Sequence, residues 1–513
     1  MTESLGKGAP AYAACDLGAS SGRVVLGSLE SGRVELRTIH RFENVPLRLP
    51  DGLHWNLLSI MGEVLGGLGR AAAEARLAAI AVDSWGVDYG LLDADGRLLG
   101  LPFHYRDSRT RGMVERAHDR VPRAELYATT GIQTMPINTI FQLLADQGSP
   151  ALDVAERLAM IPDLLALWLT GEPASEITDA STTGLLDART GEWAWGLIDR
   201  LGLPRGIFGE PIEPGTEIAP LLTEHGGELG LDAPVPVLAA AGHDTASAFV
   251  AAPMGDPDRS AVLSSGTWSL LGLELAEPVL SPQARDFNLT NERGVEGTTR
   301  LLRNVMGLWL LEECRRAWSD LGTAPGYDEL ARLAAAAPAE TPLFDPDLDE
   351  LLAPDDMPAA IATACRRTGQ EAPGGRGEMV RSILGSLACK YRLVLERLET
   401  ASGRRIEVVH VVGGGARNEL LCRLTADVLG RPVLAGPAEA TALGNVLVQA
   451  RGLDELGSLS EMRSVAAASA DPRTYEPAAD GDGDRLYERF LAVTGLESPP
   501  RQGSPGERTA ANA

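Results

Sequence analysis

The chain has 513 residues, 44% of them hydrophobic, and a formal net charge of -25. A charge this negative disfavours nucleic-acid binding through a broad basic surface. The sequence has no apolar run near the ~20 residues of a membrane span, and residues 1–10 lack the apolar core of a secretion signal. We therefore expect a cytoplasmic protein that binds neither nucleic acid nor membranes. The five scattered cysteines form no Cys-x-x-Cys pair, which favours reduced thiols over disulfides or zinc.

The scarcity of lysine restricts how this chain could bind ATP. Lysine occurs only at Lys7 and Lys390, so all but two of the 46 basic residues are arginine. A Walker-A loop needs Gly-Lys-Ser/Thr between a strand and a helix, and a protein kinase needs a strand lysine. Lys7 precedes every expected strand and Lys390 lies in an expected helix, near residues 379–398. ATP binding would therefore rely on backbone amides, a metal ion and arginine.

The first elements indicate an antiparallel hairpin. Apolar runs over 11–16 and 23–29 flank a small-residue loop, 17–22, and a third run follows residues 30–32. The next expected elements are a helix over 60–75, a buried strand over 78–82 and a hairpin that turns at 93–96.

A second half, beginning near Pro234, repeats the strand-loop-strand form. Its expected elements are a strand over 235–241, a turn at 242–245, a helix from 246, a strand over 259–263, a loop at 264–267, a strand over 268–273, and a strand over 408–412 that runs into three glycines and a helix. The alternation of strands and helices makes the class α/β, with two related halves. Residues 320–377, which include the acidic stretch 345–350, are expected to form a solvated surface insertion.

Three loops of small residues, 17–22, 264–267 and 413–415, stand at strand ends. Successive backbone N–H groups in such loops form a concave nest for an anion. Together the loops predict one polyphosphate held from several sides, although each alone is also typical of a tight turn. A dinucleotide fingerprint fails at Asn418, and the Gly-x-Ser-x-Gly letters of 18–22 precede a strand where a hydrolase has a helix.

Asp16 ends the first strand, directly before its loop. A carboxylate beside a phosphate nest repels the ligand unless a divalent cation lies between them, and Mg²⁺ bound by one carboxylate, waters and phosphates meets that need. Asp16 is therefore a candidate metal-associated residue. The alternative is an aspartate that caps a turn.

Asp244 follows a buried strand, at the edge where α/β proteins place their ligands. Phosphoryl transfer to a sugar hydroxyl needs a base that accepts the proton and orients the oxygen, and an ionised aspartate suffices. His243 and Thr245 could hydrogen-bond a polyol. An equally simple interpretation is a helix N-cap at Asp244 or Thr245.

Seven short sequence blocks occur in a fixed order along the chain. They are Asp16-Leu-Gly-Ala-Ser-Ser-Gly-Arg23, Asp83-Ser-Trp-Gly-Val-Asp88, Tyr105-Arg-Asp-Ser-Arg-Thr110, His243-Asp-Thr-Ala-Ser247, Leu263-Ser-Ser-Gly-Thr-Trp-Ser269, Asn304-Val-Met-Gly-Leu-Trp-Leu310 and Val412-Gly-Gly-Gly415. Each block is modest, but their joint order over residues 11–475 resembles the FGGY carbohydrate kinases, in particular the members that phosphorylate L-rhamnulose.

The resemblance implies two actin-like ATPase (ribonuclease H-like) domains with the active site in the cleft between them. It also implies conversion of L-rhamnulose and ATP into L-rhamnulose 1-phosphate and ADP, with Mg²⁺. The expected divisions are a flexible N-terminus at 1–10, an N-terminal domain at 11–248 for the sugar and first phosphate loop, a C-terminal nucleotide domain at 249–492, and a disordered tail at 493–513.

The resemblance also assigns residues. The ATP-binding positions are Ala19, Ser20, Ser21, Gly22, Arg23, Thr267, Glu312 and Gly414. The sugar-binding positions are Gly86, His243, Asp244, Thr245 and Asn304, with Asp244 as the proton acceptor. Glu312 departs from the family pattern, which usually has glutamine there; a carboxylate can accept a hydrogen bond from adenine or ribose but cannot donate one.

Alternatives remain open at this point. Another ketose or polyol, such as L-fuculose, L-ribulose, D-xylulose or glycerol, could be the substrate, because pocket contacts rather than the fold select the sugar. The chain could also be an actin-like switch ATPase or a non-catalytic sugar-binding relative, which the presence of both Asp16 and Asp244 disfavours. The sequence is compatible with a monomer or a homodimer.

Overall fold

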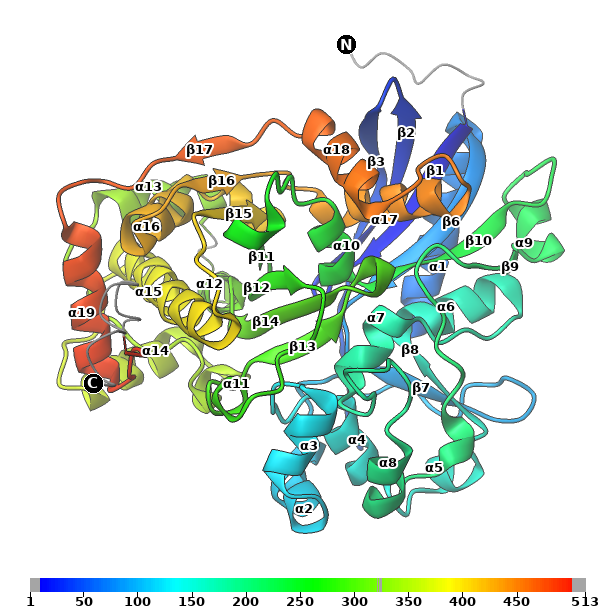
Figure 1. Cartoon of the computed structure of the whole chain (residues 1–513), viewed down its shortest axis with the longest axis horizontal. Coiled ribbons are helices and arrows are strands. Elements are labelled where there is room, and N and C mark those ends of the chain that lie inside the picture. The colour runs from blue at the N-terminus through cyan, green and yellow to red at the C-terminus, as the bar shows by residue number, and fades with distance from the viewer. Residues whose placement is uncertain (1–9, 321, 323–324, 501–513) are drawn as a thin grey trace, which may run out of the picture.

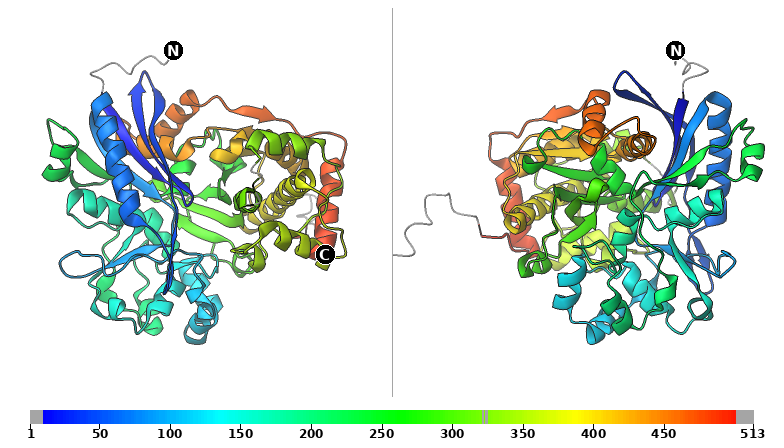
Figure 2. Two further views of the ribbon diagram at one scale, coloured as in Figure 1. Left: turned by 180° about the vertical axis from the view of Figure 1, so that it is seen from behind. Right: turned by 45° about the vertical axis from the view of Figure 1, so that its right-hand side comes forward.

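The computed structural model describes residues 10–320, 322 and 325–500. Two large mixed sheets form its framework, and helices flank each of them (Figures 1 and 2). The smaller helices α2, α3, α4, α5 and α8 gather in a group of their own below the first sheet in Figure 1.

The first sheet has the strand order β3-β2-β1-β6-β10-β9. Its strands are β1 (Pro10–Leu17), β2 (Ser21–Glu30), β3 (Arg33–Glu43), β6 (Arg76–Ser84), β9 (Glu217–Pro220) and β10 (Pro236–His243). β1 and β2 form the predicted hairpin, whereas β1, β6 and β10 are parallel, so their carboxyl ends meet at one edge. Alternate residues of β1 enter different cores, because helices cover both faces of this sheet. The helices are α1 (Leu57–Glu74) and α6 (Ile161–Thr170) on one face, and α10 (Asp244–Val250) and α17 (Ala440–Gly452) on the other.

The second sheet has the order β13-β14-β12-β11-β15-β16-β17. Its strands are β11 (Ser260–Ser265), β12 (Trp268–Leu275), β13 (Thr290–Arg293), β14 (Thr299–Met306), β15 (Val408–Val412), β16 (Val433–Ala435) and β17 (Arg473–Tyr475). The long helix α15 (Arg376–Ser402) packs against β12 and β14 and lies beside α16 (Glu419–Leu429). Leu384, Leu387 and Tyr391 of α15 are fully buried there.

Both sheets contain the same unit of three antiparallel and two parallel strands. β3-β2-β1-β6-β10 in the first sheet corresponds to β14-β12-β11-β15-β16 in the second, with identical relative directions. Each unit begins with a hairpin whose tip consists of small residues. The predicted pair of ribonuclease H-like domains is therefore confirmed.

The late helix α17 packs against the first sheet, although it follows the second sheet in the sequence (Figure 1). Gly444 permits this, because a Cβ there would lie 1.8 Å from the carbonyl oxygen of Ser247 in α10. Gln449 donates to the carbonyl of Ala13 at 3.2 Å, inside the fully buried interface. α10 and α17 thus form a close-packed junction between the two sheets.

The remaining elements connect these layers. They are β4 (Leu47–Leu49), β5 (Gly52–His54), β7 (Tyr89–Leu92), β8 (Arg157–Met160), α2 (Met113–Arg120), α3 (Arg123–Thr130), α4 (Thr139–Asp146), α5 (Pro150–Val154), α7 (Ile177–Ala180), α8 (Trp195–Leu201), α9 (Thr223–Glu228), α11 (Pro282–Asp286), α12 (Trp309–Asp320), α13 (Tyr327–Ala336), α14 (Met357–Arg367), α18 (Leu459–Ser469) and α19 (Asp482–Thr494).

The hairpin predicted to turn at 93–96 is present but short. The amide of Asp93 donates to the carbonyl of Arg97, that of Leu99 donates to the carbonyl of Leu91, and Leu92 and Leu98 form an antiparallel bridge. The longer partner of β7 is β8, which pairs with it along its whole length. Pro102, which has no N–H to donate, lies shortly beyond and disfavours a longer return strand.

The prediction of a solvated acidic insertion is wrong for residues 343–347. Phe344 is 1% exposed, and the ammonium of Lys390 in α15 lies 2.7 Å from Asp345 and 3.0 Å from Asp347. Burial alone would raise the pKa of Asp347, but Lys390 and then Arg303 hold it below its ordinary value. A sequence-distant cation therefore draws this acidic segment inward.

Residues 1–9 and 501–513, which contain most of the predicted flexible N-terminus and disordered tail, lie outside the described residues. β1 begins at Pro10, α19 ends at Thr494, and the hydroxyl of Ser498 donates to Glu396 at 2.6 Å. Among the described helices, none is both long and apolar enough to cross a membrane.

We expect Lys390→Met to lower the free energy of unfolding by about 3–5 kcal/mol at pH 7, because it removes the buried ammonium that pairs with two partly buried carboxylates and leaves only Arg303 beside Asp347. A carboxyl whose pKa is lowered by folding stabilises the protein above its unfolded pKa, and that gain is lost as the pH falls. The difference between the two proteins in urea unfolding should therefore shrink toward acid pH.

Arg97→Met is the control for this substitution, because the Arg97–Asp95 ion pair is exposed on the surface. It should cost about 0–1 kcal/mol. Equal losses in the two variants would show that the Lys390 pair contributes no more than a surface pair.

Candidate active site

One cavity of about 1320 Å³ brings together the residues that the sequence singled out. Its wall includes Asp16, Ala19, Ser20, Ser21, Arg23, Gly86, His243, Asp244, Thr245, Thr267, Asn304, Glu312 and Gly414. Gly22 is the predicted site residue that is absent from this wall; a Cβ there would lie 2.3 Å from the ring of Phe42. Gly22 therefore permits the packing of Phe42 beneath the loop.

The carbonyl groups of the first loop accept hydrogen bonds from within the protein. The carbonyl of Gly18 accepts from the Asn44 side chain at 3.1 Å, that of Ser20 accepts from the Asn44 amide at 3.0 Å, and that of Ser21 accepts from the Gly18 amide at 2.9 Å. Oxygens that would repel an anion are thus engaged elsewhere. This arrangement suits a loop that presents N–H groups to a phosphate.

The second loop follows the same plan. The amides of Leu308 and Trp309, at the start of α12, donate to the carbonyls of Gly266 and Thr267 at 3.0 and 3.1 Å. A Cβ at Gly307 would lie 2.6 Å from the backbone of Trp268, so this close approach requires glycine.

The third loop packs directly on the end of β11. A Cβ at Gly415 would lie 2.0 Å from the hydroxyl of Ser265, and Gly413 has a φ of +80° with its Cβ position 3.0 Å from the same residue's carbonyl. All three glycines line the cavity, but Gly414 alone has open space beside its Cβ position. Gly413 and Gly415 are therefore required for packing against β11, whereas Gly414 leaves room for a ligand.

Three carboxylates lie where the parallel strands end. Asp16 and Asp83 are direct partners in β1 and β6, and Asp244 follows β10. Burial and then the charge of Asp16 raise the pKa of Asp83 well above its ordinary value, while Asn445 of α17 donates to it at 2.5 Å. Among the described residues, no donor reaches the other carboxylate oxygen of Asp83, Oδ1.

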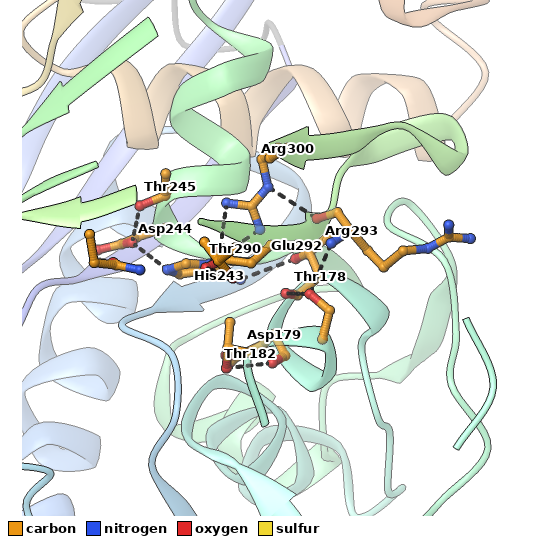
Figure 3. A network of polar contacts seen from close by, with 12 residues as sticks. Thr178, Asp179, Thr182, His243, Asp244, Thr245, Thr290, Glu292, Arg293 and Arg300 are labelled. Atoms are coloured by element: carbon orange, nitrogen blue, oxygen red, sulfur yellow. Dashed lines mark hydrogen bonds and ion pairs between the residues drawn. The ribbon is translucent and has the colours of Figure 1, made fainter. Parts of the chain in front are cut away.

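Asp244 begins α10 and has about a third of its side chain exposed to the cavity, at 32%. Thr245 donates to its Oδ1 at 3.1 Å, and Nε2 of His243 lies 3.5 Å from the same oxygen (Figure 3). Burial raises the pKa of Asp244, and His243 opposes that rise. The result is an oriented carboxylate that is accessible from the cavity and more basic than a free aspartate.

Arg23 spans two carboxylates at the phosphate loops. Its Nε and Nη2 donate to Asp16 at 3.0 and 2.7 Å, and its Nη1 pairs with Glu439, which precedes α17. Glu439 also accepts from Arg417 at 2.6 Å, beside the glycine loop. A chain of alternating charges therefore crosses the cavity wall.

Glu312 lies at the α12 end of the cavity. Its carboxylate accepts from the hydroxyl of Tyr327 and pairs with Arg315 at 3.4 Å, and the Arg315 guanidinium stacks on the Tyr327 ring at 3.9 Å. The carboxylate of Glu312, a position where the resemblance implies glutamine, thus has its own donors.

The buried carboxylate of Asp88 accepts hydrogen bonds from several residues behind the opposite wall of the cavity. It accepts from the indole N–H groups of Trp55 and Trp85 at 2.6 and 3.0 Å, from the amide of Tyr105 at 3.2 Å and from Gln142 at 2.8 Å. Burial raises the pKa of Asp88 to about 7, and these donors oppose the rise. Trp85 and Tyr105 face the cavity, so Asp88 fixes its aromatic side.

Several residues of the site had no predicted role. Glu292, Arg417 and Glu439 line the cavity, and Asp83 is buried directly beside Asp16. Only for Asp83 was there a usable signal, because it ends a predicted buried strand just as Asp16 does.

Comparison with known sequences decides the family. Residues 11–251 match the model of the N-terminal domain of the FGGY family of carbohydrate kinases, and residues 261–453 match that of its C-terminal domain. The chain belongs to this FGGY family. It is 43% identical to the rhamnulokinase of Bacteroides thetaiotaomicron, over 93% of this chain and 98% of that protein. It is 41% identical to the rhamnulokinase of Pectobacterium carotovorum subsp. carotovorum, over 95% and 97%.

Solved structures agree on the fold. The gluconate kinase of Lactobacillus acidophilus superposes with a TM-score of 0.76 at 18% identity, covering 94% of this chain and 98% of that one. The glycerol kinase of Plasmodium falciparum, solved with ADP, gives 0.75 at 15% identity, covering 96% and 99%. As a member of the FGGY family, this protein is a sugar kinase, and ATP is its phosphoryl donor.

We expect Asp88→Asn to raise KM for the sugar about tenfold at pH 8, where the wild-type carboxyl is above its pKa and ionised. Asparagine offers one acceptor oxygen and a donor N–H₂ to groups that are themselves donors, and losing one charged hydrogen bond costs ~1.5–3 kcal/mol. Steady-state kinetics in both substrates measure this. KM for ATP should change little, as in the exposed control Asp153→Asn; a rise of equal size in both KM values would contradict the role.

Proposed function

We propose that this kinase phosphorylates L-rhamnulose on its 1-hydroxyl, with ATP and Mg²⁺, as a step of L-rhamnose catabolism in the cytoplasm. The observation that carries the proposal is the 43% identity with a rhamnulokinase over nearly the full length of both proteins. Sugar kinases that share only the fold, such as the gluconate kinase, are far more distant at 18% identity.

The geometry supports a phosphoryl transfer in which this chain's residues orient the two substrates and neutralise the charge of the phosphates. The loops at Ala19–Ser21, Thr267 and Gly414 would hold the polyphosphate through backbone N–H groups. The sugar would lie between Gly86, His243, Thr245 and Asn304. Asp244 would accept the proton of the 1-hydroxyl as that oxygen bonds to the γ-phosphorus and ADP departs.

The carboxylates around Asp16 suit a cation that arrives with the nucleotide. No cluster of three or more His, Cys, Asp or Glu in the described part of the chain could hold a metal by itself. Mg²⁺ needs only one or two carboxylates, completed by waters and phosphates. Asp16, on the cavity wall, offers such an oxygen, and Asp83 lies buried beside it with its Oδ1 atom free of a donor among the described residues. Bound there, Mg²⁺ would neutralise phosphate charge beside these aspartates.

We expect ADP release to depend on a sugar and to be fastest with L-rhamnulose. A coupled assay over L-rhamnulose, L-fuculose, L-ribulose, D-xylulose and glycerol measures kcat/KM for each. A preference for any other member would overturn the substrate assignment but not the kinase chemistry. Turnover of ATP that ignores every sugar would instead indicate a switch ATPase.

We expect Asp244→Asn to lower kcat by about 10²–10⁴-fold, because the general base is lost while the shape of the site is kept. The Kd for ATP, measured by calorimetry, should stay within about twofold, since the phosphate loops are unchanged. Asp328→Asn, on the wall of the same cavity, is the matched control and should retain its turnover. If Asp244→Asn keeps most of its kcat, another group is the base.

A further inference from the structure

A buried ion pair stands directly behind His243. Oε2 of Glu292, in β13, lies 3.2 Å from Nδ1 of His243 and 3.2 Å from Nη1 of Arg300, in β14. The Glu292 side chain is 5% exposed and that of Arg300 is 0% exposed. Figure 3 shows His243 between Asp244 on one side and Glu292 with Arg300 on the other.

This pair reaches His243 from the other domain. His243 ends β10 of the first sheet, whereas Glu292 and Arg300 belong to the second sheet. Further hydrogen bonds fix Arg300 at this contact between the domains. Its Nε donates to the carbonyl of Arg293 at 3.0 Å, and the amide of Arg293 donates to the hydroxyl of Ser181 at 3.0 Å. The imidazole therefore lies where the two domains meet, with Asp244 of its own segment on one side and Glu292 and Arg300 of the second sheet on the other.

The chemistry of the pair dictates where the proton of His243 resides. Burial alone would raise the pKa of Glu292, but Arg300 and then His243 hold it below its ordinary value, so Glu292 is an ionised acceptor at neutral pH. Arg300 can only donate, and its Nη2 lies 3.2 Å from Nδ1. Nδ1 therefore has both a donor and an acceptor beside it.

Both protonation states of the ring then give the same outcome. In the neutral ring, Nδ1 accepts from Arg300 and the proton lies on Nε2. In the charged ring both nitrogens carry protons, and the carboxylate of Glu292, 3.2 Å from Nδ1, balances the charge. In either state Nε2 carries a proton, and it lies 3.5 Å from Oδ1 of Asp244, where it attracts the carboxylate without a full hydrogen bond. An unprotonated Nε2 would instead direct its lone pair at that carboxylate, and the two would repel each other.

We propose that Glu292, together with Arg300, is a positioning residue that acts through His243 to orient the carboxylate of Asp244 toward the sugar hydroxyl. The proposal rests on the proposed function, in which Asp244 is the base. It assigns to the second domain a part in assembling the sugar side of the site. Glu292 itself does not touch the reacting atoms in this role.

A double-mutant cycle tests the proposal. Glu292→Gln should lower kcat about ten- to a hundredfold while KM for ATP changes no more than about twofold, because only the orientation of the base is affected. In a His243→Asn background the same substitution should have almost no further effect on kcat, since the ring through which Glu292 acts is gone.

Two further variants keep the test decisive. Glu274→Gln removes a carboxylate from a comparably buried pair with Arg463, on the same sheet but outside the cavity wall, so it should lower stability without lowering kcat. Glu292→Asp keeps the charge, and it should retain an intermediate kcat; it replaces Glu292→Gln in the cycle if that variant does not fold.

Multiplicative losses for Glu292→Gln and His243→Asn would overturn the proposal, and so would a raised KM for the sugar with an unchanged kcat, which would make Glu292 a direct sugar contact. The cycle is run with whichever sugar the wild-type protein phosphorylates fastest. Failure of the substrate assignment is thus read from the wild type alone, and failure of the positioning role from the cycle.

Discussion

Repulsion among carboxylates is the constraint around which this cavity is built. Parallel pairing of β1 with β6 sets Asp16 beside Asp83, and β10 brings Asp244 to the same edge. Each has its own stabilising group: Arg23 in the neighbouring strand for Asp16, Asn445 of α17 for Asp83, and Thr245 for Asp244. The close packing of α17 on the first sheet is therefore part of the electrostatics of the cavity as well as of the core.

Local pattern was enough to predict the framework of the fold. The hairpin tips, the triple glycine and the alternation of strands with helices are encoded within short segments, and they sufficed for two related α/β halves. The features that were missed involve partners distant in sequence. The main partner of β7 is β8 rather than the short strand across its own turn, and residues 343–347 lie against the core because Lys390 pairs with their aspartates. Neither partner can be read from a window of neighbouring residues.

The same distinction holds for the site. Residues that end a predicted strand or form a small-residue loop could be predicted, and apart from Gly22 they line one cavity. Glu292 and Glu439 could not be predicted, because their importance comes from contacts made across the domains, with His243 and with Arg23. Their own short segments have no glycine pattern, metal-ligand spacing or strand-end position that would single them out.

The imbalance between arginine and lysine has a structural meaning that the net charge of -25 hides. Arg23 donates to Asp16 through two nitrogens and pairs with Glu439 through a third, a division of contacts that a planar guanidinium provides and a single ammonium does not. Lys390, by contrast, is a buried point charge between two aspartates and is not part of the cavity wall. An acidic protein can therefore prepare a polyphosphate site with arginines whose charges are balanced locally, because the overall charge is set by the outer surface and the ligand meets only the residues of the cavity.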